Sequence, residues 1–331
     1  MNNFKNLKKT FLIAEIGNNH EGKFSNAIKL IDHAKKCGVD AVKFQTFETK
    51  YFINKLDKKR FKKLKSFELK KKDFKKLSIY SKKKGLKFIS TPLDLKSAEF
   101  LSNIVDIFKI SSGDNNFYEL IKFCASFKKP LIISTGMIDL LEIKKILKLL
   151  KKIKFPLNKL SFLHCVSDYP VNDNEANLLS IKYIKDKLKI FVGYSDHLIG
   201  SESCLVAVTL GAKIIEKHFT LSNNFSSFRD HKLSLNPKDM QQMVSSIRRI
   251  EKMFGKYDKK ISKNEKKNLS SMRRSLYFDQ KLNKNTILQR KHIKIVRPFV
   301  SITPNSISRV IGKKLSKNVE DSESISFKII K

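Results

Sequence analysis

Long hydrophobic runs are missing from this 331-residue chain. No segment approaches the roughly 18 consecutive apolar residues that a membrane span needs, and FLIAEIG near the N-terminus is too short and too acidic for a signal peptide. Cysteine is also scarce. The four cysteines, Cys37, Cys124, Cys165 and Cys204, lie in separate segments without a CxxC pair, which argues against a disulfide framework or a zinc ribbon. We therefore expect a cytoplasmic protein in a reduced compartment.

Tryptophan is absent, yet the 25 phenylalanines and a hydrophobic content of 41% supply enough apolar surface to exclude wholesale disorder. The length predicts one large domain and a small one.

Acidic residues are few: the chain has 31 aspartates and glutamates against 69 lysines and arginines, which gives a net charge of +38. The excess is mostly lysine in helix-like stretches such as KKILKLLKKIK, which is typical of solvated helix faces, whereas nucleic-acid recognition favours arginine forks and aromatic platforms. We expect neither a nucleic-acid nor a membrane partner, although a positive field can attract anionic substrates. A non-catalytic basic barrel that binds nucleic acid stays open as an alternative.

Eight strand-length runs rich in β-branched and aromatic residues recur along the chain. They are FLIAEIG from Phe11, AVKFQTF from Ala41, KFISTPL from Lys87, IFKISS from Ile107, PLIISTG from Pro130, LSFLHCV from Leu160, FVGYSDH from Phe191 and KIIEKHFT from Lys213. Helical patterns separate them. Eight alternating units predict an α/β fold, a parallel (β/α)₈ TIM barrel; an open doubly wound sheet is the alternative, disfavoured because no GxGxxG follows the first strand.

The composition changes after the last helical pattern. We expect residues 1–255 to form the catalytic barrel, residues 256–270 a polar linker, and residues 271–331 a small β-rich domain, because short β runs split by turn residues fill that last stretch.

Polar residues end each predicted strand, where the loops of a barrel form one rim. They are Glu15, Asn19 and His20; Lys43 and Gln45; Ser90 and Thr91; Lys109 and Ser112; Ser134 and Thr135; His164 and Ser167; Ser195, Asp196 and His197; and Glu216, Lys217 and His218. Any one could be a satisfied structural residue, but eight coincidences favour a shared site. Two lysines and several hydroxyls suit a phosphorylated, carboxylated small molecule. Two histidines suggest a divalent metal with open positions, which needs a further ligand from elsewhere.

At these residues the sequence resembles the sialic acid synthase family, which condenses phosphoenolpyruvate with an N-acylated amino sugar to make nonulosonic acids. The matching stretches are IAEIGNNHEG, GVDAVKFQTF, STPLDL, FKISSGD, IISTGM, LHCVSDYP, VGYSDH, GAKIIEKHFT, DHKLSLNP and RRSL. They span nearly the whole chain, and residues 271–331 resemble the family's antifreeze-like (SAF) domain.

The resemblance implies a phosphoenolpyruvate-dependent transferase and assigns a role to each matching position. His197 and His218 would hold a divalent cation, Mn²⁺ with Mg²⁺ or Co²⁺ as alternatives. Lys43, Thr91, Lys109, Ser112, Ser134 and Ser195 would bind phosphoenolpyruvate. Gln45, Tyr169, Glu216, Asp230 and, in a domain-swapped homodimer, Arg297 would contact the amino sugar. Glu15 would be the catalytic carboxylate.

Two departures from the family pattern stand out. Phe299 follows Arg297-Pro298 where the family has glycine, so that loop must differ in conformation or enclose another acyl group, unless the change is drift in an exposed loop. Glu21 replaces the second asparagine of NHNG. The acceptor stays open between N-acetylmannosamine, a diacetamido-trideoxy hexose that leads to legionaminic or pseudaminic acid, and a spore-coat sugar; AEIG and KFQTF lean away from the pseudaminic branch.

Overall fold

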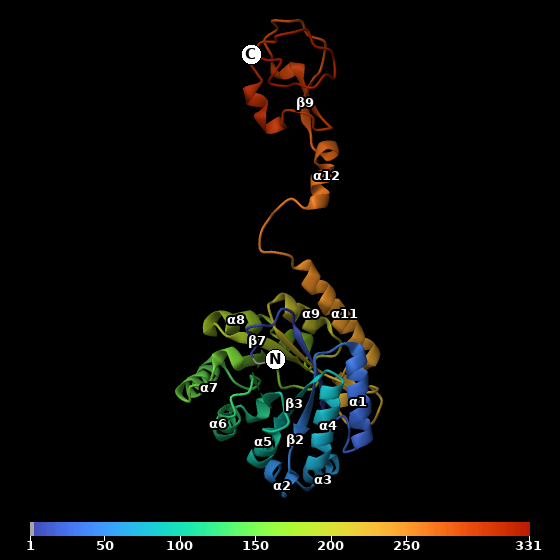
Figure 1. Ribbon diagram of the computed structural model, residues 1–331, viewed down its shortest axis with the longest axis vertical. Coiled ribbons are helices and arrows are strands. Elements are labelled where there is room, and N and C mark those ends of the chain that lie inside the picture. The colour runs from blue at the N-terminus through green and yellow to red at the C-terminus, as the bar shows by residue number, and fades with distance from the viewer. Residues whose placement is uncertain (1–2) are drawn as a thin grey trace. The chain divides into compact units, whose positions relative to one another are not determined.

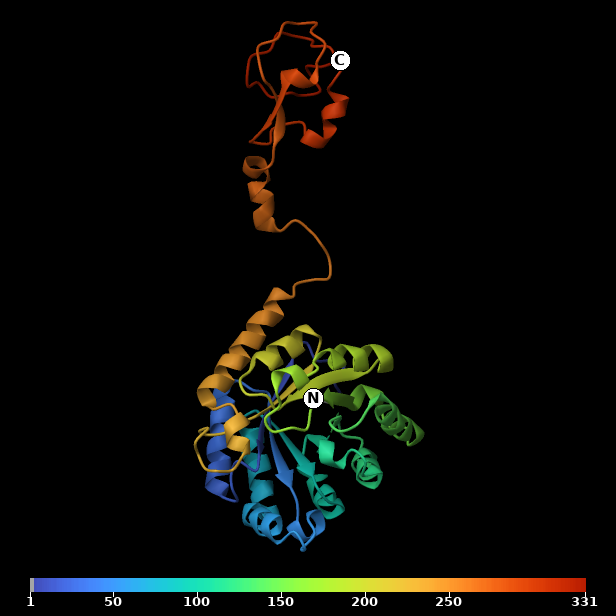
Figure 2. The same cartoon turned by 180° about the vertical axis from the view of Figure 1, so that it is seen from behind.

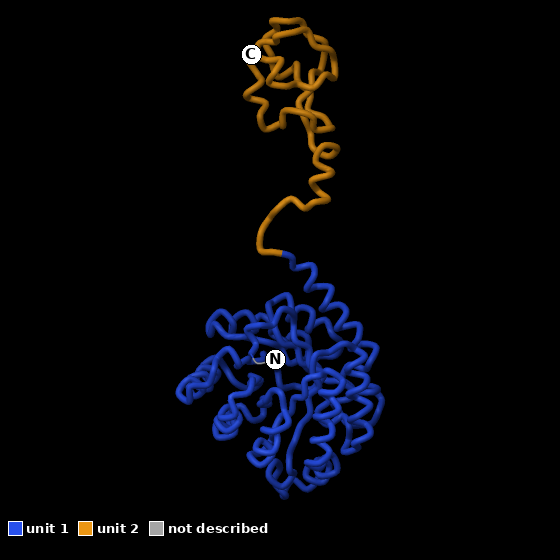
Figure 3. The backbone as a smooth tube through the Cα atoms, in the orientation of Figure 1, with its two compact units in different colours: residues 1–255 blue, residues 256–331 orange. Residues whose placement is uncertain are grey.

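The computed structural model describes residues 3–331. The chain forms two compact units, one that runs to Gly255 and a second that comprises Lys256–Lys331 (Figure 3). Within the described residues, no helix has the length and apolar content needed to cross a membrane.

The first unit is a closed barrel of eight parallel strands in chain order, which confirms the predicted fold class. The strands are β1 (Phe11–Gly17), β2 (Ala41–Thr46), β3 (Lys87–Pro92), β4 (Ile107–Ile110), β5 (Leu131–Ser134), β6 (Leu160–His164), β7 (Phe191–Asp196) and β8 (Ile214–His218). Each begins within one residue of a predicted run, because turn residues and charges bound every run. Pairing of β1 with β8 closes the barrel.

Helices surround the strands (Figures 1 and 2). They are α1 (Phe24–Cys37), α2 (Thr49–Phe52), α3 (Lys58–Phe67), α4 (Lys71–Lys83), α5 (Leu95–Leu101), α6 (Tyr118–Ser126), α7 (Leu140–Lys152), α8 (Leu179–Leu188), α9 (Glu202–Thr209), α10 (Asp230–Leu233) and α11 (Pro237–Met253). In α7, the Asp139 carboxylate caps the first turn by accepting from the backbone N–H groups of Leu141 and Glu142. The apolar stripe of α7 is buried while its lysines face outward, as expected for a surface helix.

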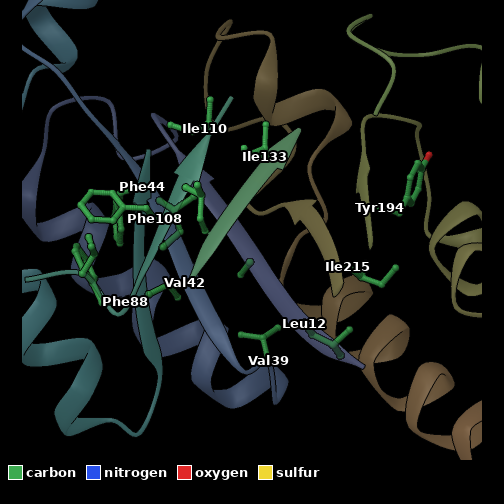
Figure 4. Close-up of a cluster of buried hydrophobic side chains, with 14 of the residues drawn as sticks. Leu12, Val39, Val42, Phe44, Phe88, Phe108, Ile110, Ile133, Tyr194 and Ile215 are labelled. Carbon is green, nitrogen blue, oxygen red and sulfur yellow. The ribbon is translucent and has the colours of Figure 1, made fainter. Parts of the chain in front are cut away.

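Alternation along the strands produces two separate apolar layers. Inward side chains, among them Ile13, Ile89 and Ile132, fill the barrel. Outward side chains such as Phe44 and Phe88 pack in the layer that includes the helices (Figure 4). The next inward position after Ile13 is Glu15, so the apolar filling gives way to polar groups at the carboxyl ends of the strands.

The second unit contains α12 (Lys263–Met272), β9 (Ser275–Phe278) and β10 (Ile293–Val296), of which β9 and β10 pair in antiparallel fashion. Its own apolar cluster includes Leu276, Phe278 and Val310. Part of the segment predicted to be a linker is helical, because Ser262 and Glu265 cap α12 reciprocally.

The Phe299 loop of the second unit does not use the left-handed backbone that would demand glycine, since Phe299 is not among the described residues with positive φ. Its N–H donates to Ser270 O at 2.7 Å. Arg297 Nε donates to Met272 O at 2.6 Å within the same unit.

Candidate active site

A cavity of about 590 Å³ opens among the carboxyl ends of the barrel strands. Twelve of the fourteen predicted site residues line it: Glu15, Lys43, Gln45, Lys109, Ser112, Ser134, Tyr169, Ser195, His197, Glu216, His218 and Asp230. The other two lie elsewhere. Thr91 is buried beside Lys43, with its Oγ1 3.4 Å from Lys43 Nζ, and Arg297 belongs to the second unit.

Strand register explains why residues so far apart in sequence meet here. Glu15 pairs with Lys43 on β2 and with His218 on β8, while Ser195 on β7 pairs with Glu216. All five side chains occupy inward positions, and in a parallel barrel the carboxyl ends of the strands share one mouth.

Two lysines and two glutamates form a buried network on the floor of the cavity. Lys43 Nζ lies 2.8 Å from Glu15 Oε1 and 3.5 Å from Glu216 Oε1. Lys109 Nζ lies 3.2 Å from Glu216 Oε1, and the Ser195 hydroxyl donates to the same oxygen at 3.0 Å. None of these four ionisable side chains is more than 5% exposed, so each depends on the others for stabilisation.

The network gives the two carboxyl groups different proton affinities. Burial raises the pKa of Glu15, and the neighbouring Glu216 adds to the effect, although Lys43 opposes it. Burial acts in the same direction on Glu216, but Lys109 and Lys43 outweigh it and lower its pKa to about 2. Glu216 is therefore a fixed anion, whereas Glu15 is the carboxyl group suited to proton exchange.

The two lysines of this network also differ in pKa. Burial lowers the pKa of Lys109, while in Lys43 the same effect is overcome by Glu15 and Glu216, which raise its pKa.

The two predicted metal-binding imidazoles face the same cavity, with ring centroids 5.4 Å apart. His197 Nδ1 lies 2.7 Å from Val166 O, so this nitrogen carries the proton and Nε2 keeps its lone pair. Burial lowers the pKa of His218 well below its usual value, and His197 adds to the effect. Burial acts in the same direction on His197, but its contacts with Cys165 and Val166 O outweigh burial and raise its pKa. His218 therefore presents the neutral form that binds metal ions, whereas metal binding at His197 displaces a proton when that ring is charged. The ring of Tyr169 packs on His197 at 4.2 Å.

The donor set fits a divalent cation only in part. Within residues 3–331, no group of three or more His, Cys, Asp or Glu side chains is placed to hold a metal ion. Several buried atoms of the cavity nevertheless have no hydrogen-bond partner in this part of the chain: His218 Nδ1, Glu15 Oε2, Glu216 Oε2 and Ser134 Oγ. Such atoms are costly unless a ligand satisfies them. Two imidazoles thus fit a cation whose remaining ligands are water or reactants.

Residues 30–259 match the NeuB family. The chain belongs to the NeuB family. It is 39% identical over 333 residues to N,N'-diacetyllegionaminic acid synthase of Campylobacter jejuni, covering 96% of this chain and 99% of the relative. It is 34% identical over 338 residues to a pseudaminic acid synthase of C. jejuni, and the alignment covers 98% of this chain and 97% of that relative. The crystal structure of N-acetylneuraminic acid (sialic acid) synthetase from Leptospira borgpetersenii is 34% identical, with a TM-score of 0.74 over 79% of this chain and 90% of that chain.

These similarities confirm the predicted family. They also confirm that this protein is an enzyme of the nonulosonic acid synthase group. The roles of the individual site residues stay predictions, and their support is the geometry above.

Not every polar residue at a strand end joins the site. Lys217 and Asp196 point outward and form a buried pair, with Lys217 Nζ 2.6 Å from Asp196 Oδ2. His164 Nε2 contacts Ala176 O at 2.9 Å, and His20 Nδ1 accepts from the Gly22 N–H at 3.0 Å. These residues hold loops of the NeuB-family barrel in place instead of lining its cavity.

Some cavity residues were not predicted. Cys165, Asn18 and Ser111 adjoin the strand ends; Phe52, Arg60, Lys63, Leu64 and Phe67 come from α2 and α3; Ser227, Phe228 and Arg229 precede α10. The position of Cys165 after β6 was a usable signal. No signal marked α3, because its lysine-rich sequence resembles a solvated surface helix.

The buried Lys217–Asp196 pair leads to a stability prediction. Both side chains are 0% exposed, so Lys217→Met leaves an unpaired buried carboxylate, and we expect the free energy of unfolding to fall by about 3–5 kcal/mol. Urea titration followed by far-UV circular dichroism measures this change. The matched control, Lys84→Met, removes an exposed partner of Asp32 and should leave stability nearly unchanged. Equal effects of the two substitutions would contradict the structural role assigned to Lys217.

Proposed function

We propose that this protein condenses phosphoenolpyruvate with an N-acylated amino hexose to form a nonulosonic acid and inorganic phosphate. The observation that carries the proposal is that one cavity combines an anion-binding floor, built by Lys43, Lys109 and Ser134, with the paired imidazoles of His197 and His218. Neither feature alone would distinguish a condensing enzyme from a simple anion-binding protein.

The floor suits phosphoenolpyruvate. The ammonium groups of Lys43 and Lys109 neutralise phosphate and carboxylate, and hydroxyls of Ser112, Ser134 and Ser195 donate to their oxygens. Ser134 Oγ is unpartnered within the described chain and so is free to bind. Thr91 contributes through its contact with Lys43 and is better placed as a positioning residue than as a direct ligand.

The imidazoles of His197 and His218 serve the part of the cavity that binds the amino sugar. His197 and His218 would hold a divalent cation, Mn²⁺ in our proposal, which when bound would supply Lewis-acid polarisation of the open-chain aldehyde toward attack by C3 of phosphoenolpyruvate. Gln45, Tyr169, Glu216 and Asp230 orient the sugar.

Glu15 acts where charge develops. Attack by C3 leaves positive character at C2 of phosphoenolpyruvate, and the Glu15 carboxylate stabilises it. Water then adds at C2, a carboxyl group or the phosphate takes its proton, and cleavage of the C2–O bond releases phosphate. Because Glu15 and Lys43 are almost fully buried, these charges interact in a site that largely excludes bulk water.

We retain as proposals an antifreeze-like second domain, a domain-swapped homodimer, and contact of the N-acyl group with Arg297 of the partner subunit. The main support for the first is that the similarity to the legionaminic synthase covers 96% of this chain and so extends into the second unit. The greater identity to the legionaminic than to the pseudaminic synthase of C. jejuni, 39% against 34%, favours the diacetamido-trideoxy hexose that leads to legionaminic acid over the one that leads to pseudaminic acid. N-acetylmannosamine and spore-coat sugars are the alternatives.

The function is tested by incubating the purified chain with phosphoenolpyruvate, Mn²⁺ and single acylated amino sugars. We expect phosphate release only with a suitable acceptor and only until a chelator is added, together with a nonulosonate detected by mass spectrometry. Phosphate release that is indifferent to the acceptor, or its absence with every acceptor tried, would contradict the proposal.

A further inference from the structure

The segment that follows β8 supplies part of the cavity lining. Ser227, Phe228, Arg229 and Asp230 line the cavity, and they belong to residues 222–231, which we call the mouth segment. Ser227 and Arg229 are exposed to solvent, whereas Asp230 is buried. A loop at a ligand site is mobile unless packing or hydrogen bonds hold it. The position of Asp230 therefore depends on the contacts that hold the mouth segment.

The base of the mouth segment is closed by hydrogen bonds to the chain on either side of it. The Thr220 N–H donates to Leu235 O at 3.0 Å. Asn223 Nδ2 donates to Ser234 O at 2.7 Å. Because neither bond involves residues 224–230, other contacts must hold the part of the segment that lines the cavity.

Glu21 contacts the mouth segment from the turn between β1 and α1. Its Oε1 accepts a hydrogen bond from the Ser226 hydroxyl and lies 3.3 Å from His231 Nε2. The Thr220 hydroxyl lies 2.7 Å from Nδ1 of the same ring. When this hydroxyl donates to Nδ1, the ring proton is on Nε2, where Glu21 accepts it. One carboxylate oxygen thus binds two points of the mouth segment, before and after Phe228.

The Ser226 hydroxyl connects Glu21 with the backbone of Phe228. It donates to Glu21 and accepts from the Phe228 N–H at 3.0 Å. The Phe228 ring packs edge to face on Phe67 of α3 at 5.1 Å. The side chain of His231 is 1% exposed, so without the carboxylate its Nε2 would be a buried donor without a partner. Such a loss favours rearrangement of the segment.

The residues after Phe228 reach the part of the cavity proposed to bind the amino sugar. Arg229 Nε lies 3.3 Å from Asp230 Oδ1, and its guanidinium group stacks over the Tyr169 ring at 4.7 Å. The lysines of the cavity floor come from strands β2 and β4 instead. A displaced mouth segment would therefore disturb the amino sugar site and leave the phosphoenolpyruvate site in place.

We propose that Glu21 is a positioning residue that holds the mouth segment in the conformation in which Asp230 binds the amino sugar. This inference rests on the proposed function and adds to it a residue that is not among the described residues lining the cavity. A segment that is already ordered lowers the penalty for binding the acceptor. Without the carboxylate oxygen, that penalty falls on the acceptor alone.

Two substitutions of Glu21 test the inference. Methionine and glutamine are both unbranched, so they meet the same strain at the φ of 49° that Glu21 adopts. Glu21→Met removes the acceptor oxygen, and we expect the KM for the amino sugar to rise about 10-fold while the KM for phosphoenolpyruvate is unchanged. Glu21→Gln keeps an oxygen that can accept both hydrogen bonds and should restore the normal KM. The control, Glu119→Met at an exposed position of α6, should alter neither constant.

The amino sugar in these assays is the diacetamido-trideoxy hexose that leads to legionaminic acid, or N-acetylmannosamine where the first is not turned over. Ser226→Ala removes the same contact from the other side and should raise the KM for the sugar as well. The double variant with Glu21→Met should show less than the product of the single effects, because both changes break one contact. Hydrogen exchange of residues 222–231 should be faster in Glu21→Met and normal in Glu21→Gln.

The outcomes separate this inference from the function beneath it. An unchanged KM for the sugar in Glu21→Met overturns the inference, and so do equal rises in both KM values. A Glu21→Gln variant as impaired as Glu21→Met overturns it as well. In each of these cases the unaltered protein still releases phosphate, and the proposed function stands. No phosphate release with any acylated amino sugar overturns the proposed function, and this inference with it.

Discussion

His218→Ala is expected to lower kcat by about a thousandfold or more and to weaken Mn²⁺ binding in parallel. The imidazole of His218 is buried, and its burial and the nearby His197 hold its pKa well below the usual value, so it stays a neutral metal ligand at physiological pH. Removing it leaves His197 as the one imidazole that faces the cavity among residues 3–331. Loss of the several kcal/mol that a Lewis acid supplies corresponds to the expected drop in kcat.

Two measurements check this result: phosphate release at saturating reactants, and the electron paramagnetic resonance signal of free Mn²⁺ during titration of the protein. His33→Ala is the control, because His33 lies on α1 and does not line the cavity. Undiminished turnover, or Mn²⁺ affinity equal to that of the unaltered protein, would remove the two imidazoles from the proposed site.

Glu15→Gln is expected to lower kcat about 10²–10⁴-fold while the KM values for both reactants change little. Glutamine keeps the volume of the side chain but cannot carry the negative charge that opposes the developing positive charge at C2. Glu15 Oε2 has no partner within residues 3–331, so this oxygen is available to the reactants.

The same residue predicts a pH dependence. Burial, with Glu216, raises the pKa of Glu15, so as pH falls it takes up a proton at a higher pH than an ordinary glutamate. Because the ionised form is required, kcat should decline on the acid side above the usual glutamate range, and the residual activity of Glu15→Gln should lack this decline. Glu99→Gln on α5, an exposed position, should behave like the unaltered protein. An identical acid limb in Glu15→Gln would assign the titration to another group.

The barrel and its polar rim could be predicted because they depend on local patterns. Hydrophobic runs of strand length mark the strands, and alternation by two puts Glu15, Lys43 and Lys109 on the inner face above isoleucines. The same alternation separates Glu216 and His218, which point inward, from Lys217, which points outward.

Contacts between distant segments could not be predicted in this way. The edge-to-face packing of Phe67 on Phe228 joins residues of α3 and the segment before α10, and neither sequence carries a signal for the other. Glu21 shows the same limit. It stood out only as a departure from the family pattern. In the structure its backbone has a φ of 49°, and its side chain contacts Ser226 and His231, which precede and follow Phe228 in the chain.

The most direct test of the account uses phosphoenolpyruvate labelled with ¹⁸O in the oxygen that bridges C2 and phosphorus. If Lys43, Lys109 and Glu15 promote attack by C3 and loss of phosphate from C2, one labelled phosphate should appear for each nonulosonate formed with Mn²⁺ and the acceptor. Label retained in the sugar product, or labelled phosphate formed without an acceptor, would contradict condensation in this cavity.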